Sequence, residues 1–194
     1  MSDAKRSRLD RLIMFWFGDN RPDGRYDDRA IWWKKDPAFD RVLRDHFLPD
    51  HEAAAAGGYD ACCDRALHAL AAVICLDQLP RNIFRDSPRM YATDPLALAH
   101  AEAAIAAGLD RRVPPTCRTF FYTPFEHAED LAAQERAVEL FTAMRGTDPE
   151  VTRIVRRHHE IVERFGRFPH RNAILGRETT PEEAEFLKEP DSAF

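Results

Sequence analysis

Three Asp-Pro pairs constrain the fold of this 194-residue chain more than any other feature of its sequence. They are Asp36-Pro37, Asp94-Pro95 and Asp148-Pro149, and helix-forming sequence follows each of them. Aspartate is a favoured N-cap, and proline suits the first helical position because the N–H that it lacks would be unpaired there. Each pair therefore predicts the start of a helix. Thr180, with Glu183 three residues later, predicts a fourth start through a capping box.

The remaining apolar segments also have helical periodicity, and no long alternating run typical of a strand appears. The sequence predicts an all-α fold of about seven or eight helices. Short connections favour antiparallel neighbours, so we expect a right-handed array of helical hairpins or an irregular bundle. The length fits a single domain over residues 1–194, with an irregular loop at 18–35 and an acidic C-terminal segment, 178–194, that holds a short helix.

Composition excludes several classes of protein. The formal net charge of −5 argues against a nucleic-acid-binding protein, which is usually strongly basic. The apolar run "LIMFWF" at 12–17 is too short for a membrane span or a typical signal-peptide core. We therefore expect a cytoplasmic protein with neither nucleic acid nor membrane as a partner, and its oligomeric state is left open. The four cysteines form no C-x-x-C pair, so neither structural zinc nor disulfides are expected.

Polar residues fall on the apolar stripes of three predicted helices. Asp77 continues the apolar face of the helix after Tyr59, and His158 lies within that of the helix after Asp148. His127, Asp130 and Gln134 share the apolar side of a third helix. Buried polar groups need partners, so groups from separate helices could pair in a structural network or could line one pocket.

Two Pro-containing turns are expected beside these helices, "PRN" at 80–82 and "PHRN" at 169–172. Arg167 shortly precedes "PHRN" and Arg171 lies within it, and fixed guanidinium forks of this kind bind carboxylate or phosphate. Residues 153–171 carry a net charge of +4, whereas residues 172–194 carry −4. The acidic tail could therefore neutralise the basic segment, so an anion site and a structural clamp both remain open. Trp32 and Trp33 are expected to anchor the 18–35 loop in the core, with a partner surface or pocket lid as the alternative.

The segments "LDQLPRNIFR", "FYTPFEHAEDLAAQERAVELF" and "HHEIVERFGRFPHRNAILGRETTPEE" resemble the bacterial family called domain of unknown function 924. The resemblance extends over nearly the whole chain and implies a superhelical, TPR-like all-α fold, but no established reaction. Ala128 stands where the family usually has serine, and Thr123 where it usually has an aliphatic residue. The residues that match the family signature are Asp77, Gln78, Pro80, Arg81, Asn82, Arg85, Pro124, His127, Glu129, Asp130, Gln134, His158, Arg164, Arg167, Pro169, His170, Arg171 and Asn172.

Binding of an anionic small molecule or a peptide terminus in an Arg/His/Asp-lined pocket is the predicted function. Fixed guanidinium groups would hold the anion, and histidines would add hydrogen bonds. The candidate ligand-binding residues are Gln78, Arg81, Asn82, Gln134, Arg167, His170, Arg171 and Asn172.

Two other functions remain open. In a hydrolase-type enzyme, His127 or His158, oriented by Asp77 or Asp130, would act as the general acid or base. A divalent metal on these four residues is a variant, but no H-E-x-x-H motif supports it, and we predict no metal. In a TPR-like protein-interaction module the polar core would be purely structural. No cofactor is predicted, because glycine-rich phosphate loops are absent, and no base partner for a cysteine is visible in the sequence.

Overall fold

The computed structural model describes residues 3–18, 29–144 and 148–194, and over these residues it contains nine α-helices and no strand. The all-α prediction is confirmed. The number of helices is consistent with the seven or eight expected, since α8 (Asn172–Leu175) and α9 (Pro181–Phe186) have only four and six residues. The right-handed, TPR-like arrangement stays a prediction.

The chain divides into two compact units. Unit 1 comprises residues 1–85 and 89–124, and unit 2 comprises residues 86–88 and 125–194. The single-domain assignment stays a prediction.

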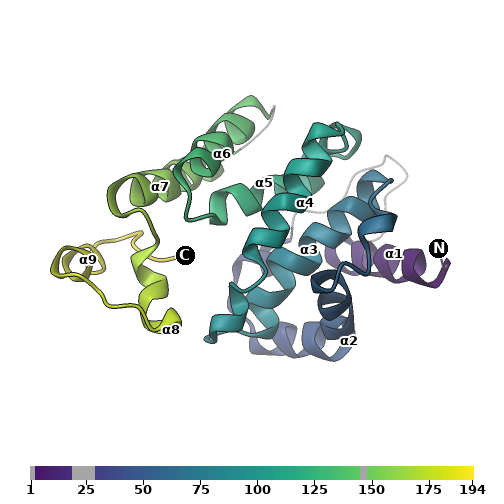
Figure 1. Cartoon of the computed structure of the whole chain (residues 1–194), viewed down its shortest axis with the longest axis horizontal. Coiled ribbons are helices and arrows are strands. Elements are labelled where there is room, and N and C mark those ends of the chain that lie inside the picture. Colours follow the sequence, from purple (N-terminus) through teal and green to yellow (C-terminus); the bar gives the residue numbers. More distant parts are fainter. Residues whose placement is uncertain (1–2, 19–28, 145–147) are drawn as a thin grey trace. The chain divides into compact units, whose positions relative to one another are not determined.

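Helix α3 (Ala66–Ile83) is the central element of unit 1, as its apolar sequence predicts. It packs against α1 (Asp3–Phe17), α2 (Pro37–Ala55) and α4 (Asp94–Ala106) (Figure 1). Nearly every α3 residue is buried, which explains why this helix is apolar on almost all sides. The first ten residues of α5 (Pro115–His127) complete the unit.

Aromatic side chains form much of the core of unit 1. Trp16 and Trp32 stack, and the Trp32 indole N–H donates to the Trp16 carbonyl oxygen at 3.0 Å. Phe120 packs edge-on against both rings. Trp33 stacks on Phe120 but stays 59% exposed. Core anchoring of the 18–35 loop is thus observed for Trp32 and not for Trp33, and residues 19–28 of that loop lie outside the described part.

The proline of "PRN" lies inside α3, so the expectation of a turn at 80–82 is wrong. Pro80 has no N–H to donate to the Leu76 carbonyl oxygen four residues earlier. The Thr93 hydroxyl donates to this oxygen instead, at 2.6 Å, so the helix continues without an unpaired carbonyl.

Asp94 also differs from its predicted role. It is the first residue of α4, Thr93 occupies the N-cap position, and the Asp94 carboxylate binds Arg81.

Unit 2 begins with the end of α5 and contains α6 (Leu131–Ala143) and α7 (Pro149–Phe165), which pack against each other (Figure 1). A short 3-10 helix, Pro169–Arg171, precedes α8 and α9. Asp148 caps α7, and Thr180 and Glu183 form the capping box of α9, so both predicted starts are confirmed. Gly166 ends α7 with a left-handed φ of 69°.

Residues of α7, of α9 and of the turn after α7 form an apolar core cluster in unit 2. Ile161, Val162, Phe168 and Phe186 are its buried members. Among the described residues of the whole chain, no helix has both the length and the apolar character that a membrane crossing requires.

Candidate functional site

The residues expected to share one pocket are distributed over both units. Asp77, Gln78, Arg81 and Asn82 belong to unit 1, and the other predicted site residues belong to unit 2. That the two sets form one pocket stays a prediction.

Carboxylates of unit 1 hold Arg81. Its guanidinium donates to both carboxylate oxygens of Asp94, at 2.8 and 3.0 Å, and its Nη1 lies 3.3 Å from an oxygen of the fully buried Asp77. Asp77 also accepts hydrogen bonds from the Gln78 amide at 2.6 Å and from the Thr123 hydroxyl at 3.1 Å. These contacts connect α3, α4 and α5. Thr123 thus donates a hydrogen bond that an aliphatic residue could not.

Asn82 continues this network along α3. Its amide donates to the Gln78 carbonyl oxygen at 3.1 Å, and its own oxygen accepts from Arg85. Arg85 makes a bidentate pair with Asp40 of α2, at 2.7 and 2.8 Å. Of the predicted ligand-binding residues of unit 1, Arg81 therefore connects α3 to α4, whereas Gln78 and Asn82 bind Asp77 and Arg85, whose side chains contact other helices.

In unit 2, Glu129 fixes the turn that contains "FGRFPHRN". Its carboxylate makes a bidentate pair with Arg177, at 2.6 and 2.9 Å, and accepts the Phe168 backbone N–H at 2.7 Å. Arg177 also donates to the Phe168 carbonyl oxygen and to the Asn172 side chain. Burial raises the pKa of Glu129, but these donors outweigh it and hold that pKa below its usual value.

Glu183 makes a second clamp on the same turn. It accepts two hydrogen bonds from Arg167, at 2.6 and 2.9 Å, and one from Asn172 at 3.2 Å. These Arg167 bonds and the capping-box bond from the Thr180 N–H lower the pKa of Glu183 to about 2. The acidic tail thus neutralises part of the basic segment, and Arg167 and Asn172 serve a structural clamp.

The carbonyl end of α5 is the binding partner of two further predicted residues, Gln134 and Arg171. The Gln134 amide donates to the carbonyl oxygens of residues 126 and 128, both at 2.7 Å, and Arg171 donates to that of His127 at 3.0 Å. Such carbonyl groups have no partner within their own helix, so these side chains terminate α5. Asp130 is exposed and caps α6 by accepting the Ala133 N–H at 2.9 Å.

Three histidines and one arginine gather in unit 2, and we call His127, His158, His170 and Arg171 the histidine cluster. His158, 4% exposed, donates from Nδ1 to the Ile154 carbonyl oxygen at 2.9 Å. Burial is the main cause that lowers the pKa of His158 to about 3, and the other three members lower it further. Burial, with the Arg171 charge, lowers the pKa of His170 to about 4. Both rings are therefore neutral at pH 7.

Aromatic rings surround this cluster. The Phe194 ring stacks on His158 with 3.7 Å between centroids and lies nearly perpendicular to His170 at 6.0 Å. The Arg171 guanidinium lies 4.5 Å from the centre of the Phe168 ring. His170 Nδ1 is buried and has no hydrogen-bond partner among the described residues. The cluster can therefore offer neutral imidazole nitrogens beside one permanent positive charge.

The carboxylates that bind the predicted basic residues were not predicted from the sequence. Glu126 lies 3.2 Å from His158 Nδ1, a contact that by itself would favour the charged ring. Glu129 stood in the family signature without an assigned role, and Glu183 was considered only as a capping residue. The position of Glu183 beside a basic residue could have been suspected from the opposite charges of segments 153–171 and 172–194, but Glu126 and Glu129 lie outside both segments.

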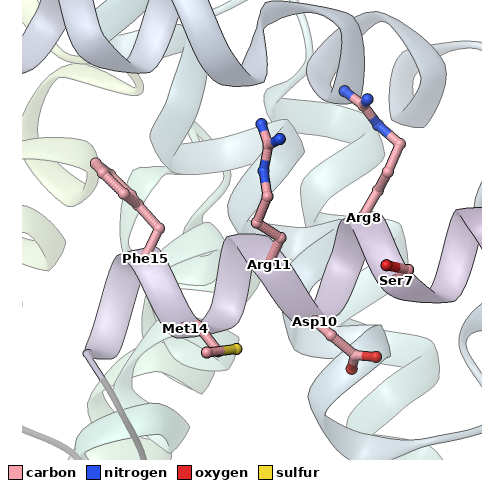
Figure 2. A pocket seen from close by; sticks show the side chains of 6 residues that line it. All are labelled: Ser7, Arg8, Asp10, Arg11, Met14 and Phe15. Atoms are coloured by element: carbon pink, nitrogen blue, oxygen red, sulfur yellow. The ribbon is translucent and has the colours of Figure 1, made fainter.

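A hollow of about 570 Å³ lies along α1 and contains none of the predicted site residues. Its lining residues are Ser7, Arg8, Asp10, Arg11, Met14 and Phe15 (Figure 2). In Figure 2, Arg8, Arg11 and Phe15 point to one side of the helix and Asp10 and Met14 to the other. Arg8 pairs with Asp50 at 2.6 and 2.7 Å, and Asp10 with His68 at 2.8 Å. Two of the lining side chains, Arg8 and Asp10, therefore already anchor α1.

Within the described residues, no group of three or more His, Cys, Asp or Glu side chains has a geometry that could hold a metal ion.

Replacing Glu129 with alanine is expected to lower the free energy of unfolding by about 2–3 kcal/mol, because Arg177 and the Phe168 N–H lose a charged acceptor. Urea denaturation measures the change. Glu160→Ala is the matched control, since Glu160 is exposed on α7 and lies 3.4 Å from Arg157. A loss no larger for Glu129→Ala than for Glu160→Ala would contradict the clamp.

Comparison with known proteins gives a family but no activity. Residues 12–191 match the family described as bacterial protein of unknown function (DUF924). The chain is also similar to a solved structure, that of a protein of unknown function from Agrobacterium tumefaciens. The two are 44% identical, the TM-score is 0.83, and the match covers 96% of this chain and 99% of the other. No curated protein matches the chain. Because the match spans almost the entire chain, the protein belongs to the DUF924 family.

Proposed function

We propose that the protein binds an anionic small molecule at the histidine cluster of unit 2. The observation that carries this proposal is His170 Nδ1, a buried nitrogen without a hydrogen-bond partner among the described residues. A buried polar atom in this state costs about 1–3 kcal/mol, part of which a ligand oxygen would recover by accepting from Nδ1–H. Arg171 is close enough to lower the pKa of His170, and its charge favours an anion over a neutral ligand.

The proposed site is narrower than the set of residues predicted from the sequence. Arg81 and Arg167 are outside it, because Asp77, Asp94 and Glu183 occupy their guanidinium groups. A phosphate or a carboxylate, including that of a peptide terminus, has the charge and the acceptor oxygens that His170 and Arg171 would bind.

Phe194 covers the cluster in this structure. Its ring is stacked on His158, yet 52% of the residue is exposed, so solvent already reaches its outer side. A ligand that approaches His158 and His170 would displace this ring. Truncating Phe194 should therefore increase ligand affinity if the cluster is a covered binding site. If the cluster is only a structural core, the truncation should produce no such increase.

Thermal unfolding in the presence of anions tests the proposal. The probes are inorganic phosphate, adenosine monophosphate, citrate and acetate, each added to wild type and to single variants. A compound at about 100 times its dissociation constant adds about 2.7 kcal/mol of stability. We expect at least one anion to raise the Tm of wild type, to raise that of Phe194→Ala at lower concentration, and to have no effect on His170→Ala.

His159→Ala is the matched control, because His159 is half-buried on the same helix as His158 and is not a member of the cluster. It should keep the response of the wild type. If none of the anions raises the Tm of wild type or of Phe194→Ala, or if His170→Ala responds as wild type does, the proposal is wrong.

Acid–base catalysis is the second candidate, and one distance favours it. Glu126 lies 3.2 Å from His158 Nδ1, and a carboxylate in this position orients an imidazole so that Nε2 can accept a proton. The two aspartates first considered are less suitable, since Asp130 caps α6 and Asp77 accepts from Gln78 and Thr123. A pKa of about 3 makes His158 a weak base near pH 7. Binding is therefore the better supported function. Hydrolysis of nitrophenyl esters that Glu126→Gln abolishes would reverse this ranking.

A further inference from the structure

A thiol, an imidazole and a carboxylate lie next to one another in unit 1, on residues that take part in none of the contacts described above. Cys63 Sγ lies 4.0 Å from His100 Nδ1, and His100 Nε2 lies 3.5 Å from an oxygen of Asp60. Asp60 and Cys63 belong to the connection between α2 and α3, whereas His100 belongs to α4. The sequence could not show this arrangement, because the imidazole and the thiol are 37 residues apart.

We propose that Cys63 is a nucleophilic thiol that reacts with organic disulfides, with His100 as its proton acceptor and Asp60 as a positioning residue. A nucleophile beside a base that a third group orients is the usual arrangement of an activated thiol. The Asp60 carboxylate favours the tautomer of His100 that carries its proton on Nε2, which leaves the lone pair of Nδ1 toward Sγ. Contacts of this kind are often long before a reagent binds.

The reaction needs no reagent besides the disulfide. The Cys63 proton moves to His100 Nδ1, and the thiolate attacks one sulfur of the reagent. A new S–S bond forms to Cys63 as the S–S bond of the reagent breaks. The second sulfur leaves as a thiolate, which takes up the proton from His100 or is released as an anion.

Other groups around Cys63 affect how readily its thiol loses the proton. Sγ lies 3.5 Å from the Tyr59 carbonyl oxygen, which accepts the thiol proton in the unreacted protein. The neighbouring Asp64 carboxylate would oppose a thiolate, but Arg6 binds it at 3.0 Å, and Arg65 follows in the chain. Cys63 is half-buried, so a small disulfide can reach it.

Two other thiols serve as internal controls. Cys75 and Cys117 are both fully buried. Burial raises the pKa of Cys117 to about 12, and that of Cys75 well above its usual value. Neither should react while the protein is folded.

The experiment follows the reaction of full-length protein with dithiobis(nitrobenzoate), measured by release of the coloured thiolate. Cys62→Ser is the starting variant, so that the neighbouring cysteine does not contribute, and mass spectrometry of peptides identifies the modified residue. We expect one fast thiol, Cys63. His100→Asn should lower its rate at pH 7 at least about tenfold. Asp60→Asn should shift the pH at which the rate is half-maximal, a change that a merely structural role would not produce.

His46→Asn, an exposed histidine of the same unit, should leave the rate unchanged. Circular dichroism establishes that each variant is folded, and His100→Gln replaces His100→Asn if the latter is not. The proposal is overturned if Cys63 reacts no faster than cysteine in a short unstructured peptide. It is equally overturned if the rate is the same with and without His100.

Discussion

Replacing Arg81 with alanine is expected to lower the free energy of unfolding by about 3–5 kcal/mol, the cost of leaving a buried charge without its partner. Asp77 is fully buried, and the Arg81 guanidinium, 3.3 Å away, is the positive group that compensates it. The same guanidinium binds Asp94 at the start of α4. Its loss therefore removes both a charge pair within α3 and an ion pair between α3 and α4. Urea denaturation followed by circular dichroism measures the change.

Arg111→Ala is the control for this variant. Arg111 is exposed in unit 1, and its truncation should change stability by no more than about 0.5 kcal/mol. If Arg81 binds a ligand, as the sequence alone allows, Arg81→Ala should keep its stability and lose a response to anions. That pair of results would contradict the structural assignment of Arg81.

Lowering the pH from 7.5 to 5 is expected to destabilise the protein by about 4 kcal/mol through His158 and His170. Both pKa values are lowered by burial, to about 3 and about 4, so the folded rings stay neutral at pH 5. In the unfolded chain the same rings bind protons below about pH 6.5. The stability that they contribute is therefore complete above pH 6.5 and is lost as the pH falls toward the folded values. Each ring contributes about 2 kcal/mol of this loss at pH 5.

Urea denaturation at several pH values between 7.5 and 5 checks this slope. His51 of unit 1, whose pKa burial also lowers, adds a change of the same sign. The control is His158→Asn combined with His170→Asn, whose unfolding should depend much less on pH. A wild-type stability that stays constant or rises over this range would show that the two rings become charged in the folded protein.

Local signals in the sequence predicted most of the fold. Asp36, Asp148 and Thr180 cap their helices as expected, because a cap depends only on the next three residues. The turn at Pro80 was predicted wrongly because the hydroxyl that replaces its missing donor belongs to Thr93, on a later element. A local pattern cannot show such a donor.

The candidate site was predictable only in part. Helical periodicity identified Asp77, Gln134 and His158 as polar residues that point inward, and all three are buried. Periodicity does not show which side chain of another element lies opposite. Glu183 and Glu129 bind the arginines in and after the "FGRFPHRN" turn across separations of 16 and 48 residues along the chain. The choice between anion site and clamp therefore required the tertiary structure.

Nuclear magnetic resonance of the histidine ring nitrogens tests the proposed anion site most directly. The protein contains eight histidines, and the ring signals report both protonation and hydrogen bonding of each one. Inorganic phosphate is added first at pH 7, followed by adenosine monophosphate, citrate and acetate in separate titrations. We predict that at least one anion shifts the His170 Nδ1 signal, together with His158, while the ring of His46 in unit 1 is unaffected. If no anion moves the His170 signal, or if only exposed histidines respond, the histidine cluster does not bind anions.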